Sequence, residues 1–292
     1  MADAIGEIVR DGDVLALEGF THLIPFAAGH EIIRQRRRDL TLCRLTPDLI
    51  YDQMIAAGCV RKLVFSWAGN PGVGSLHAFR RAVEAQPPRI EIEEYSHFGM
   101  LMRLMAGAAN LSFMPLRTYT GSQIAQVNPQ IAQVTCPYTG EIYNTVPALR
   151  LDVAIVHAQC VDAEGNAHIW GLLGAQKEAA FAASRVIVVA EQIVPTASIR
   201  ADPNRTLIPG LIVDAVVHEP FGAHPSYVHG YYDRDNAFYN AWDAISRDPD
   251  ALERYLAEMV YGVADREEYA AKLGREALLQ QVPPGWRQPE WT

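Results

Sequence analysis

Two glycine-containing segments lie where an α/β protein places backbone groups for chemistry. The first, Glu18-Gly19-Phe20-Thr21, follows the apolar run 14–17, and the second, residues 69–74 (Gly-Asn-Pro-Gly-Val-Gly), follows the apolar run 63–67. Both runs are expected to be buried strands, and loops at the carboxyl ends of such strands bring backbone N–H groups close to a ligand. The alternative is that these glycines only allow tight turns and close packing.

The chain lacks the sequence patterns of several common catalytic sites. Residues 69–74 fit neither GxGxxG nor GxxxxGK[ST], so they give little support for a phosphate-binding loop. No GxSxG motif is present. The four cysteines form no CxxC pair, and the nine histidines include no His-x3-His pair. We therefore expect reduced cysteines, no metal site and no activated serine or cysteine.

Polar residues follow a further expected strand, residues 151–156. His157 and Gln159 could face a ligand at the edge of the sheet, or His157 could be a structural histidine with satisfied hydrogen bonds. The run 220–236 concentrates glycine, proline and aromatic residues without a regular period. Such a segment must be held by tertiary contacts, so it is expected to be either part of a functional site or a subunit surface.

The composition excludes some classes of partner. The 292 residues carry a formal net charge of −9 with thinly spread basic residues, which argues against nucleic-acid binding. The one basic cluster, Arg34 with Arg36, Arg37 and Arg38, is expected to complement the dipole at the end of a helix, the alternative being contact with an anionic ligand. No run approaches the roughly 18 apolar residues that span a bilayer, so we expect no membrane association and a cytoplasmic location.

Helical and strand patterns alternate along the chain, which is typical of a largely parallel sheet flanked by helices. The expected strands are residues 14–17, 40–45, 63–67, 90–93, 151–156, 167–170, 186–190 and 215–218. The expected helices are residues 3–10, 25–36, 51–57, 79–85, 98–109, 177–183 and 251–273. Ser75 is well placed to cap the helix 79–85. Residues 115–145 are expected to form a long excursion rather than a domain linker.

Several separated blocks carry a resemblance to one enzyme family. The N-terminal block is Asp11-Gly12-Asp-Val-Leu-Ala-Leu-Glu18-Gly19-Phe20, with Pro25 beyond it. Further blocks are 46–49 (Thr-Pro-Asp-Leu), 70–75 (Asn-Pro-Gly-Val-Gly-Ser), 152–159, 165–171, 222–226 and 232–236. Over residues 1–274 the chain resembles the α subunits of family I CoA transferases, of the glutaconate and 3-oxoadipate types. It departs from the family signature at Glu18, where a glycine is usual.

This resemblance implies a NagB/RpiA-like α/β fold and an α2β2 assembly in which the β subunit supplies the nucleophilic glutamate within a Ser-Glu-Asn-Gly motif. This chain has no such motif, so we expect it to hold no catalytic residue. Acyl-CoA thioesters and a dicarboxylic acid such as 3-oxoadipate would be substrates, with no resident cofactor. The residues expected to bind substrate are Gly19, Phe20, Asn70, Gly72, Val73 and Gly74. Pro71 replaces a family serine in the second loop.

Two other activities remain as alternatives on the same fold. Related hydrolases carry a catalytic glutamate just before a Gly-Met pair, whereas here Gly99-Met100 follows His97-Phe98. A sugar-phosphate sensor or scaffold would bind ligand without a partner chain. Within the transferases, glutaconate or a similar diacid is the alternative substrate. The family domain is expected to be residues 1–274, followed by a mobile, proline-rich C-terminal tail, residues 275–292.

Overall fold

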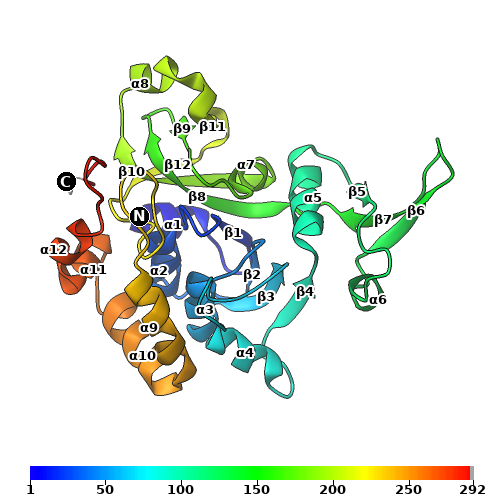
Figure 1. The fold of residues 1–292 in the computed structure, drawn as a ribbon, viewed down its shortest axis with the longest axis horizontal. Helices are drawn as coiled ribbons and strands as arrows, with labels where there is room; N and C mark the ends of the chain where they lie inside the picture. The colour runs from blue at the N-terminus through cyan, green and yellow to red at the C-terminus, as the bar shows by residue number, and fades with distance from the viewer. Residues whose placement is uncertain (290–292) are drawn as a thin grey trace.

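The computed structural model describes residues 1–289 and centres on a largely parallel sheet (Figure 1). Its parallel strands are β1 (Val14–Glu18), β2 (Leu40–Cys43), β3 (Val60–Phe65), β4 (Glu91–Glu94), β8 (Leu151–Val161), β10 (Ala183–Ile193) and β12 (Ala215–His218). They lie in the order β12-β10-β8-β1-β2-β3-β4, and every neighbouring pair is parallel. The predicted sheet is confirmed, although β8 and β10 are longer than expected.

Helices cover both faces of this sheet. One face packs against α1 (Ala2–Ile8), α2 (Phe26–Arg34), α3 (Leu49–Ala56) and α4 (His77–Glu84). The other face packs against α5 (His97–Ala108) and α7 (Gln176–Phe181). Alternation within β1 explains the two layers, because Leu15 and Leu17 join the first core while Ala16 joins the second. The helix α4 begins at His77 without a side-chain cap, so the predicted capping by Ser75 is wrong.

A small antiparallel sheet projects from one side of the molecule, beyond α5 (Figure 1). It contains β5 (Phe113–Leu116), β6 (Ala132–Thr135) and β7 (Ile142–Pro147) in the order β5-β7-β6, with the short helix α6 (Ile124–Val127) between β5 and β6. This sheet occupies the expected excursion 115–145. Its strands were not predicted, because β5 and β6 are short and largely accessible to solvent and β7, although partly buried, is a mixture of polar and apolar residues.

A second extension follows the end of β8. Here β9 (Ala167–His168) pairs antiparallel with both β8 and β11 (Thr206–Ile208). The connection contains α8 (Thr196–Ala201) and the 3-10 turns η1 (Pro203–Arg205) and η2 (Gly210–Ile212). The run 220–236 then leads from β12 (Ala215–His218) to the C-terminal helices.

The C-terminal part is helical but divided. It contains α9 (Asn236–Arg247), α10 (Pro249–Leu256), the π-helical segment η3 (Ala257–Tyr261), α11 (Arg266–Leu273) and α12 (Arg275–Leu279). The single helix expected over 251–273 is therefore wrong, because the chain turns at Gly262 and restarts at Asp265, whose side chain caps α11. The helix α9 was not predicted, although Asp235 caps it in the same way.

The segment expected to be a mobile tail contacts the body of the protein as far as it is described. Leu278 is buried, Asp233 N donates to Gln281 O, and Arg287 N donates to Gly230 O at 3.0 Å. Residues 290–292 lie outside the described part, and the domain limit at residue 274 stays a prediction. None of the helices formed by residues 1–289 has the length and apolar character needed to cross a membrane.

Candidate functional site

The order in which successive strands are added to the sheet changes direction between the parallel neighbours β1 and β8. Strands β2, β3 and β4 extend the sheet on one side of β1, whereas β10 and β12 extend it on the other side of β8. In open α/β sheets, loops diverge at the carboxyl ends of such a strand pair and leave room for a ligand. Since β1 ends at Glu18, the predicted residues Gly19 and Phe20 lie at this point.

The turn after β1 requires glycine at position 19. A Cβ atom there would lie 2.7 Å from the carbonyl oxygens of both His22 and Leu23, which is closer than real contacts allow. Thr21 and Leu23 themselves have φ values of 55° and 56°, so the chain folds back sharply. Arg44 fixes this turn, because its Nε and Nη2 atoms donate to the Gly19 carbonyl oxygen at 2.9 and 2.5 Å.

Arg44 is itself held by a buried ion pair. Its Nη1 atom lies 3.0 Å from Asp48 Oδ1, and both side chains are inaccessible to solvent. Removing either partner of a buried ion pair is strongly destabilising, because the other partner is left as a buried charge without compensation. The pair therefore anchors the Gly19 turn from the end of β2, and neither group is free to react with a substrate.

The second predicted loop, residues 70–74, is closed by its own hydrogen bonds. Asn70 N donates to Gly74 O at 2.8 Å, and the N–H groups of Val73 and Gly74 donate to Asn70 O at 3.0 and 3.1 Å. The buried Asn70 side chain donates from Nδ2 to Tyr239 O at 2.7 Å. Gly72, with φ of 78°, has no acceptor for its N–H group among residues 1–289. Of the backbone donors expected here, Gly72 N is therefore the one left for a ligand.

A cation from the run 220–236 supports this second loop. Arg234 Nη2 donates to Pro71 O at 2.8 Å, and its guanidinium group lies over the Tyr239 ring, 3.7 Å from the ring centroid. Tyr239 is also the acceptor for Asn70. The run 220–236 and α9 thus hold the loop 70–74 in place. The same contacts help to hold the run 220–236, which has no regular period of its own.

Two side chains near Phe20 were not singled out from the sequence. His97, at the start of α5, lies edge to face with Phe20 at 6.5 Å between ring centroids, and its Nδ1 atom is 2.9 Å from Ser66 Oγ. The Ser66 hydroxyl donates to Leu45 O at 2.6 Å, so His97 Nδ1–H is the donor to Ser66. His97 is not arranged to deprotonate Ser66, which argues against a serine nucleophile.

Comparisons with known proteins agree with this geometry. Residues 1–219 match the family model described as Coenzyme A transferase. The chain is 52% identical to the α subunit of the 3-oxoadipate CoA-transferase of Pseudomonas knackmussii, covering 94% of this chain and 96% of the relative. The chain belongs to the coenzyme A transferase family. It is the α subunit of a family I enzyme, and because such relatives are named as one subunit of a larger enzyme, a β subunit is implied.

Two further relatives are similar to this CoA-transferase chain over more than nine-tenths of its length. It is 34% identical to the α subunit of the glutaconate CoA-transferase of Acidaminococcus fermentans, and the crystal structure of that enzyme matches with a TM-score of 0.92 over 98% of this chain and 95% of the other. It is 28% identical to a cholesterol ring-cleaving hydrolase subunit of Rhodococcus jostii, covering 92% of this chain and 94% of the relative. The expected CoA-transferase fold is confirmed.

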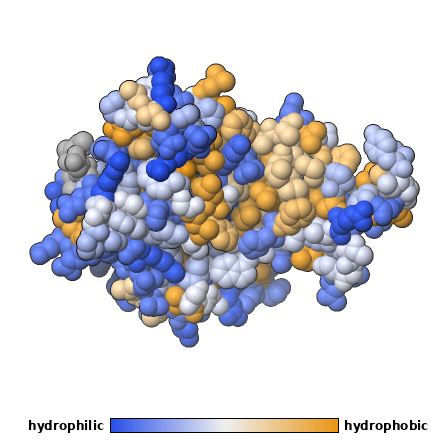
Figure 2. Space-filling view, turned by 45° about the horizontal axis from the view of Figure 1, so that its top comes forward, coloured by the Kyte–Doolittle hydropathy of each residue, from blue (hydrophilic) through white to orange (hydrophobic). Residues whose placement is uncertain are grey.

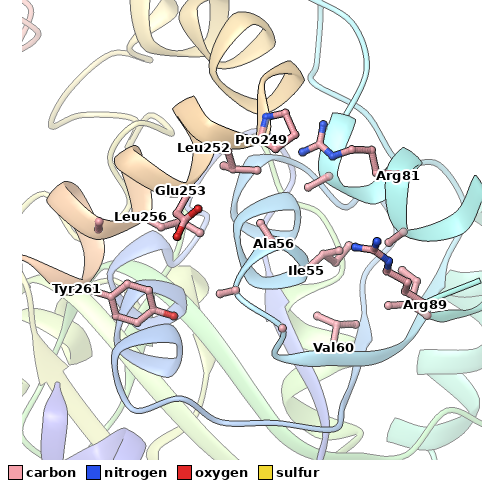
Figure 3. Close-up of a pocket in the computed structure, with 16 residues that line it drawn as sticks. Ile55, Ala56, Val60, Arg81, Arg89, Pro249, Leu252, Glu253, Leu256 and Tyr261 are labelled. Atoms are coloured by element: carbon pink, nitrogen blue, oxygen red, sulfur yellow. The ribbon is translucent and has the colours of Figure 1, made fainter. Parts of the chain in front are cut away.

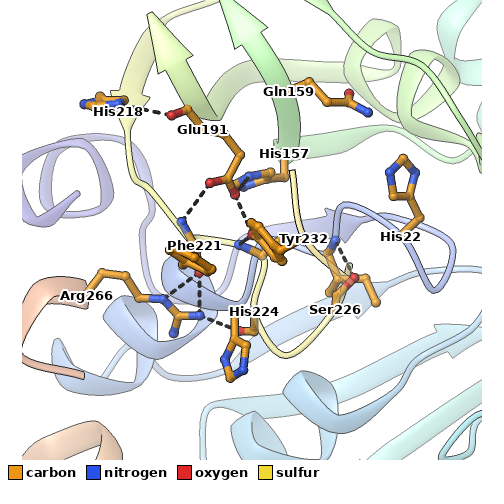
Figure 4. Close-up of polar contacts among 12 residues, drawn as sticks. His22, His157, Gln159, Glu191, His218, Phe221, His224, Ser226, Tyr232 and Arg266 are labelled. Atoms are coloured by element: carbon orange, nitrogen blue, oxygen red, sulfur yellow. Dashed lines mark hydrogen bonds and ion pairs between the residues drawn. The ribbon is translucent and has the colours of Figure 1, made fainter. Parts of the chain in front are cut away.

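In this CoA-transferase chain His157 belongs to a buried cluster (Figure 4), whereas Gln159 Nε2 donates to Trp170 O at 2.8 Å. His157 Nε2 lies 2.7 Å from Glu191 Oε1, and Glu191 also accepts hydrogen bonds from the Tyr232 hydroxyl and from Phe221 N. These four side chains are fully or almost fully buried. His157 is therefore buried in a structural cluster, but its Nδ1 atom has no hydrogen-bond partner among residues 1–289, so the expectation of a histidine with satisfied hydrogen bonds is met only in part. The cluster fastens the run 220–236 to the sheet.

The basic cluster also has a structural role. Arg34 lies in the last turn of α2, and Arg37 Nη2 donates to Gly6 O at 2.9 Å, near the end of α1. Both contacts fit the interpretation that these cations complement helix ends. Among residues 1–289, no group of three or more His, Cys, Asp or Glu side chains is arranged to hold a metal ion.

A cavity of about 710 Å³ lies at the opposite edge of the sheet (Figure 3). Its walls come from α3, α4 and α10, with Arg81 and Arg89 on one side and Glu253 on the other. It includes Val60, the first residue of β3, so it lies at the amino ends of the strands. This cavity is therefore separate from the Gly19 turn, and it contains none of the residues predicted to bind substrate.

Proposed function

We propose that this chain is the α subunit of an α2β2 CoA transferase that moves CoA from succinyl-CoA, or another acyl-CoA, to a dicarboxylic acid such as 3-oxoadipate. The observation that carries this proposal is the 52% identity to the α subunit of a 3-oxoadipate CoA-transferase over nearly the whole of both chains. The substrate assignment extends the name of that relative to this chain. Acyl-CoA thioesters serve as substrates, and the reaction needs no resident cofactor.

The nucleophile in this proposal is a glutamate of the β subunit. Its carboxylate attacks the thioester carbonyl and expels CoA thiolate, which leaves an acyl–glutamyl anhydride. The thiolate then attacks the glutamyl carbonyl, releasing the first acid and forming a glutamyl-CoA thioester. The acceptor carboxylate repeats both steps in reverse, so that the acceptor leaves as its CoA thioester and the glutamate is regenerated. No net proton transfer is required.

The environment of the Gly19 turn supports a nucleophile from outside this chain. The carboxyl group of Glu18 precedes the turn directly, and that of Asp48 reaches it through Arg44. Both carboxyl groups are about 1% exposed, so an acyl-CoA cannot approach them. The Gly19 turn can shape a pocket, and the loop 70–74 can present Gly72 N–H to a developing oxyanion, for which one donor contributes about 3 kcal/mol.

An apolar surface beside the turn supports a partner chain. Trp67 and Phe98 are 44% and 48% exposed, and Phe181 is 39% exposed. Apolar atoms gather on the face shown in Figure 2, over the part of the molecule that carries α5 and beside the projecting small sheet. Exposed apolar areas next to a ligand site are typical of protein interfaces. A β subunit placed there would complete the pocket around Phe20.

The decisive experiment separates the chain from its proposed partner. The chain is purified alone and together with a candidate β subunit that contains Ser-Glu-Asn-Gly, and succinyl-CoA-dependent formation of 3-oxoadipyl-CoA is measured. We expect activity only from the pair. Transfer by the chain alone would contradict the division of labour between the subunits.

Two alternatives are tested in the same preparation. The TM-score of 0.92 to a glutaconate CoA-transferase favours glutaconate as the second candidate acceptor, so glutaconate is included in the acid panel. The hydrolase alternative predicts release of CoA without any acceptor acid. We expect no such release, because His97-Phe98 precedes Gly99-Met100 where the hydrolases carry a glutamate.

A further inference from the structure

Glu18, Phe20 and His22, which alternate along the Gly19 turn, contact a second loop. We name residues 171–175 (Gly-Leu-Leu-Gly-Ala) the leucine loop. Ala175 N donates to Glu18 Oε1 at 3.4 Å, and His22 Nδ1 donates to Leu172 O at 2.9 Å. Between them, Phe20 packs so closely that a Cβ atom on Gly174 would lie 2.8 Å from Phe20 Cβ. The two loops therefore form one unit, although they are about 150 residues apart in sequence.

The protonation of His22 is fixed by its two contacts. His22 Nε2 accepts from His229 N at 3.0 Å, so the ring is neutral with its proton on Nδ1, where it donates to Leu172. Burial lowers the pKa of His22 to about 4, which keeps this form across the neutral range. His22 therefore keeps the proton that it donates to the leucine loop throughout the neutral pH range.

Glu18 and Gln176 bind two successive amides of the leucine loop. Gln176 Oε1 accepts from Gly174 N at 2.7 Å, and Glu18 Oε1 accepts from Ala175 N. Both side chains are buried, yet Glu18 Oε2 and Gln176 Nε2 have no partner among residues 1–289. Burying polar atoms without hydrogen-bond partners costs folding free energy. The presence of Glu18 and Gln176 here therefore indicates that the leucine loop must be held in one conformation.

The leucine loop presents two apolar side chains beside the proposed acyl site. Leu172 and Leu173 are 44% and 45% exposed, even though the backbone that carries them is fixed at Leu172, Gly174 and Ala175. Rigid backbone with exposed apolar side chains is typical of a surface that discriminates ligands by shape. A flexible loop would not discriminate between ligands of different length, because it could adapt to each of them.

From these contacts we infer that the leucine loop is the specificity-determining wall of the acyl pocket, and that Glu18 and His22 are positioning residues that set its place relative to Phe20. The inference rests on the proposed transferase function and names the part of the chain that selects the acid. Leu172 and Leu173 contact the carbon chain between the two carboxylates of the diacid. The length of that chain is then limited by the distance from the leucine loop to the reacting carboxylate.

The test measures acceptor selectivity in the assembled enzyme. With succinyl-CoA as donor, kcat/KM is determined for straight α,ω-dicarboxylic acids of four to seven carbons. In Leu173→Ala we expect the ratio of longer to shorter acceptors to rise about tenfold, the low end of the effect of one methylene group in an apolar pocket. Leu211→Ala removes an exposed leucine that lies in η2, outside the leucine loop, and it should leave the ratio unchanged.

The positioning role of Glu18 is tested in the same panel. Glu18→Ala frees the Ala175 amide, so we expect the acceptor KM to rise about tenfold, with the wild-type preference for chain length weakened. Glu18→Gln keeps an acceptor oxygen of the same reach and should restore the wild-type preference at pH 6. A merely structural defect would lower activity equally for all acids and would not be rescued by glutamine in this way.

The possible outcomes separate the inference from the function on which it rests. If the wild-type pair transfers CoA to none of the acids, the proposed function fails and the inference fails with it. If the wild-type pair is active but Leu173→Ala leaves the length preference unchanged, only the inference is overturned. If Leu173→Ala instead separates the subunits in size-exclusion chromatography, the leucine loop is a docking surface, which also overturns it.

Discussion

Glu18 gives a sharp prediction about the dependence of stability on pH. Its carboxyl group ends β1 inside the protein, and burial raises its pKa from 4.5 to about 7, against the opposing effect of Arg44. Glu178 raises it slightly as well, and Arg44 also interacts with Tyr51. The folded protein therefore binds this proton more tightly than the unfolded chain does.

The sign and size of the effect follow from this difference. The contribution of Glu18 to the free energy of unfolding is fully present below about pH 4.5 and is lost as the pH rises to about 7. A difference between 4.5 and about 7 corresponds to about 3 kcal/mol. Because glutamine does not titrate, Glu18→Gln should gain stability relative to wild type by up to about 3 kcal/mol between pH 4.5 and pH 8.

The assay is urea denaturation of the full chain at half-unit pH intervals, for wild type and Glu18→Gln. Burial also raises the pKa values of Asp52 and Glu219 to about 6, but these groups titrate in both proteins and cancel in the difference. Glu84→Gln, which removes an exposed carboxylate, serves as the control. If the curves for wild type and Glu18→Gln run parallel from pH 4.5 to pH 8, then Glu18 is not a buried acid of raised pKa.

Three further changes test the candidate site. Gly19→Ala should destabilise the chain by about 2 to 4 kcal/mol, because the new Cβ meets two carbonyl oxygens at 2.7 Å, whereas Gly6→Ala in α1 should be neutral or slightly stabilising. Arg44→Met should cost about 3 to 5 kcal/mol in urea denaturation by leaving Asp48 buried and unpaired, and adding Asp48→Leu should recover most of the loss. Phe98→Asp should abolish co-purification with the β subunit while leaving the thermal midpoint of the lone chain within a few degrees, since this side chain is 48% exposed; retained co-purification would place the interface elsewhere.

Local patterns predicted much of the sheet. The apolar run at 14–17 appears as β1, because a strand buried on both faces needs a continuous apolar run. The run at 215–218 appears as β12, which is only partly buried. The helices α9 and α8 were missed, since the first follows an aperiodic loop and the second is only six residues long. The small sheet was missed because its outer strands β5 and β6 are short and largely accessible to solvent, so their residues need not alternate.

The order of residues alone establishes that glycine loops follow two buried strands and that the chain carries no Ser-Glu-Asn-Gly motif. What surrounds those loops depends on the folded chain. Folding uses up the N–H groups of Asn70, Val73 and Gly74 inside their own loop, and it brings Arg44 to the Gly19 carbonyl oxygen. The difference comes from range: strand and turn preferences depend on neighbouring residues, whereas burial and hydrogen-bond partners depend on segments that meet only when the sheet has formed.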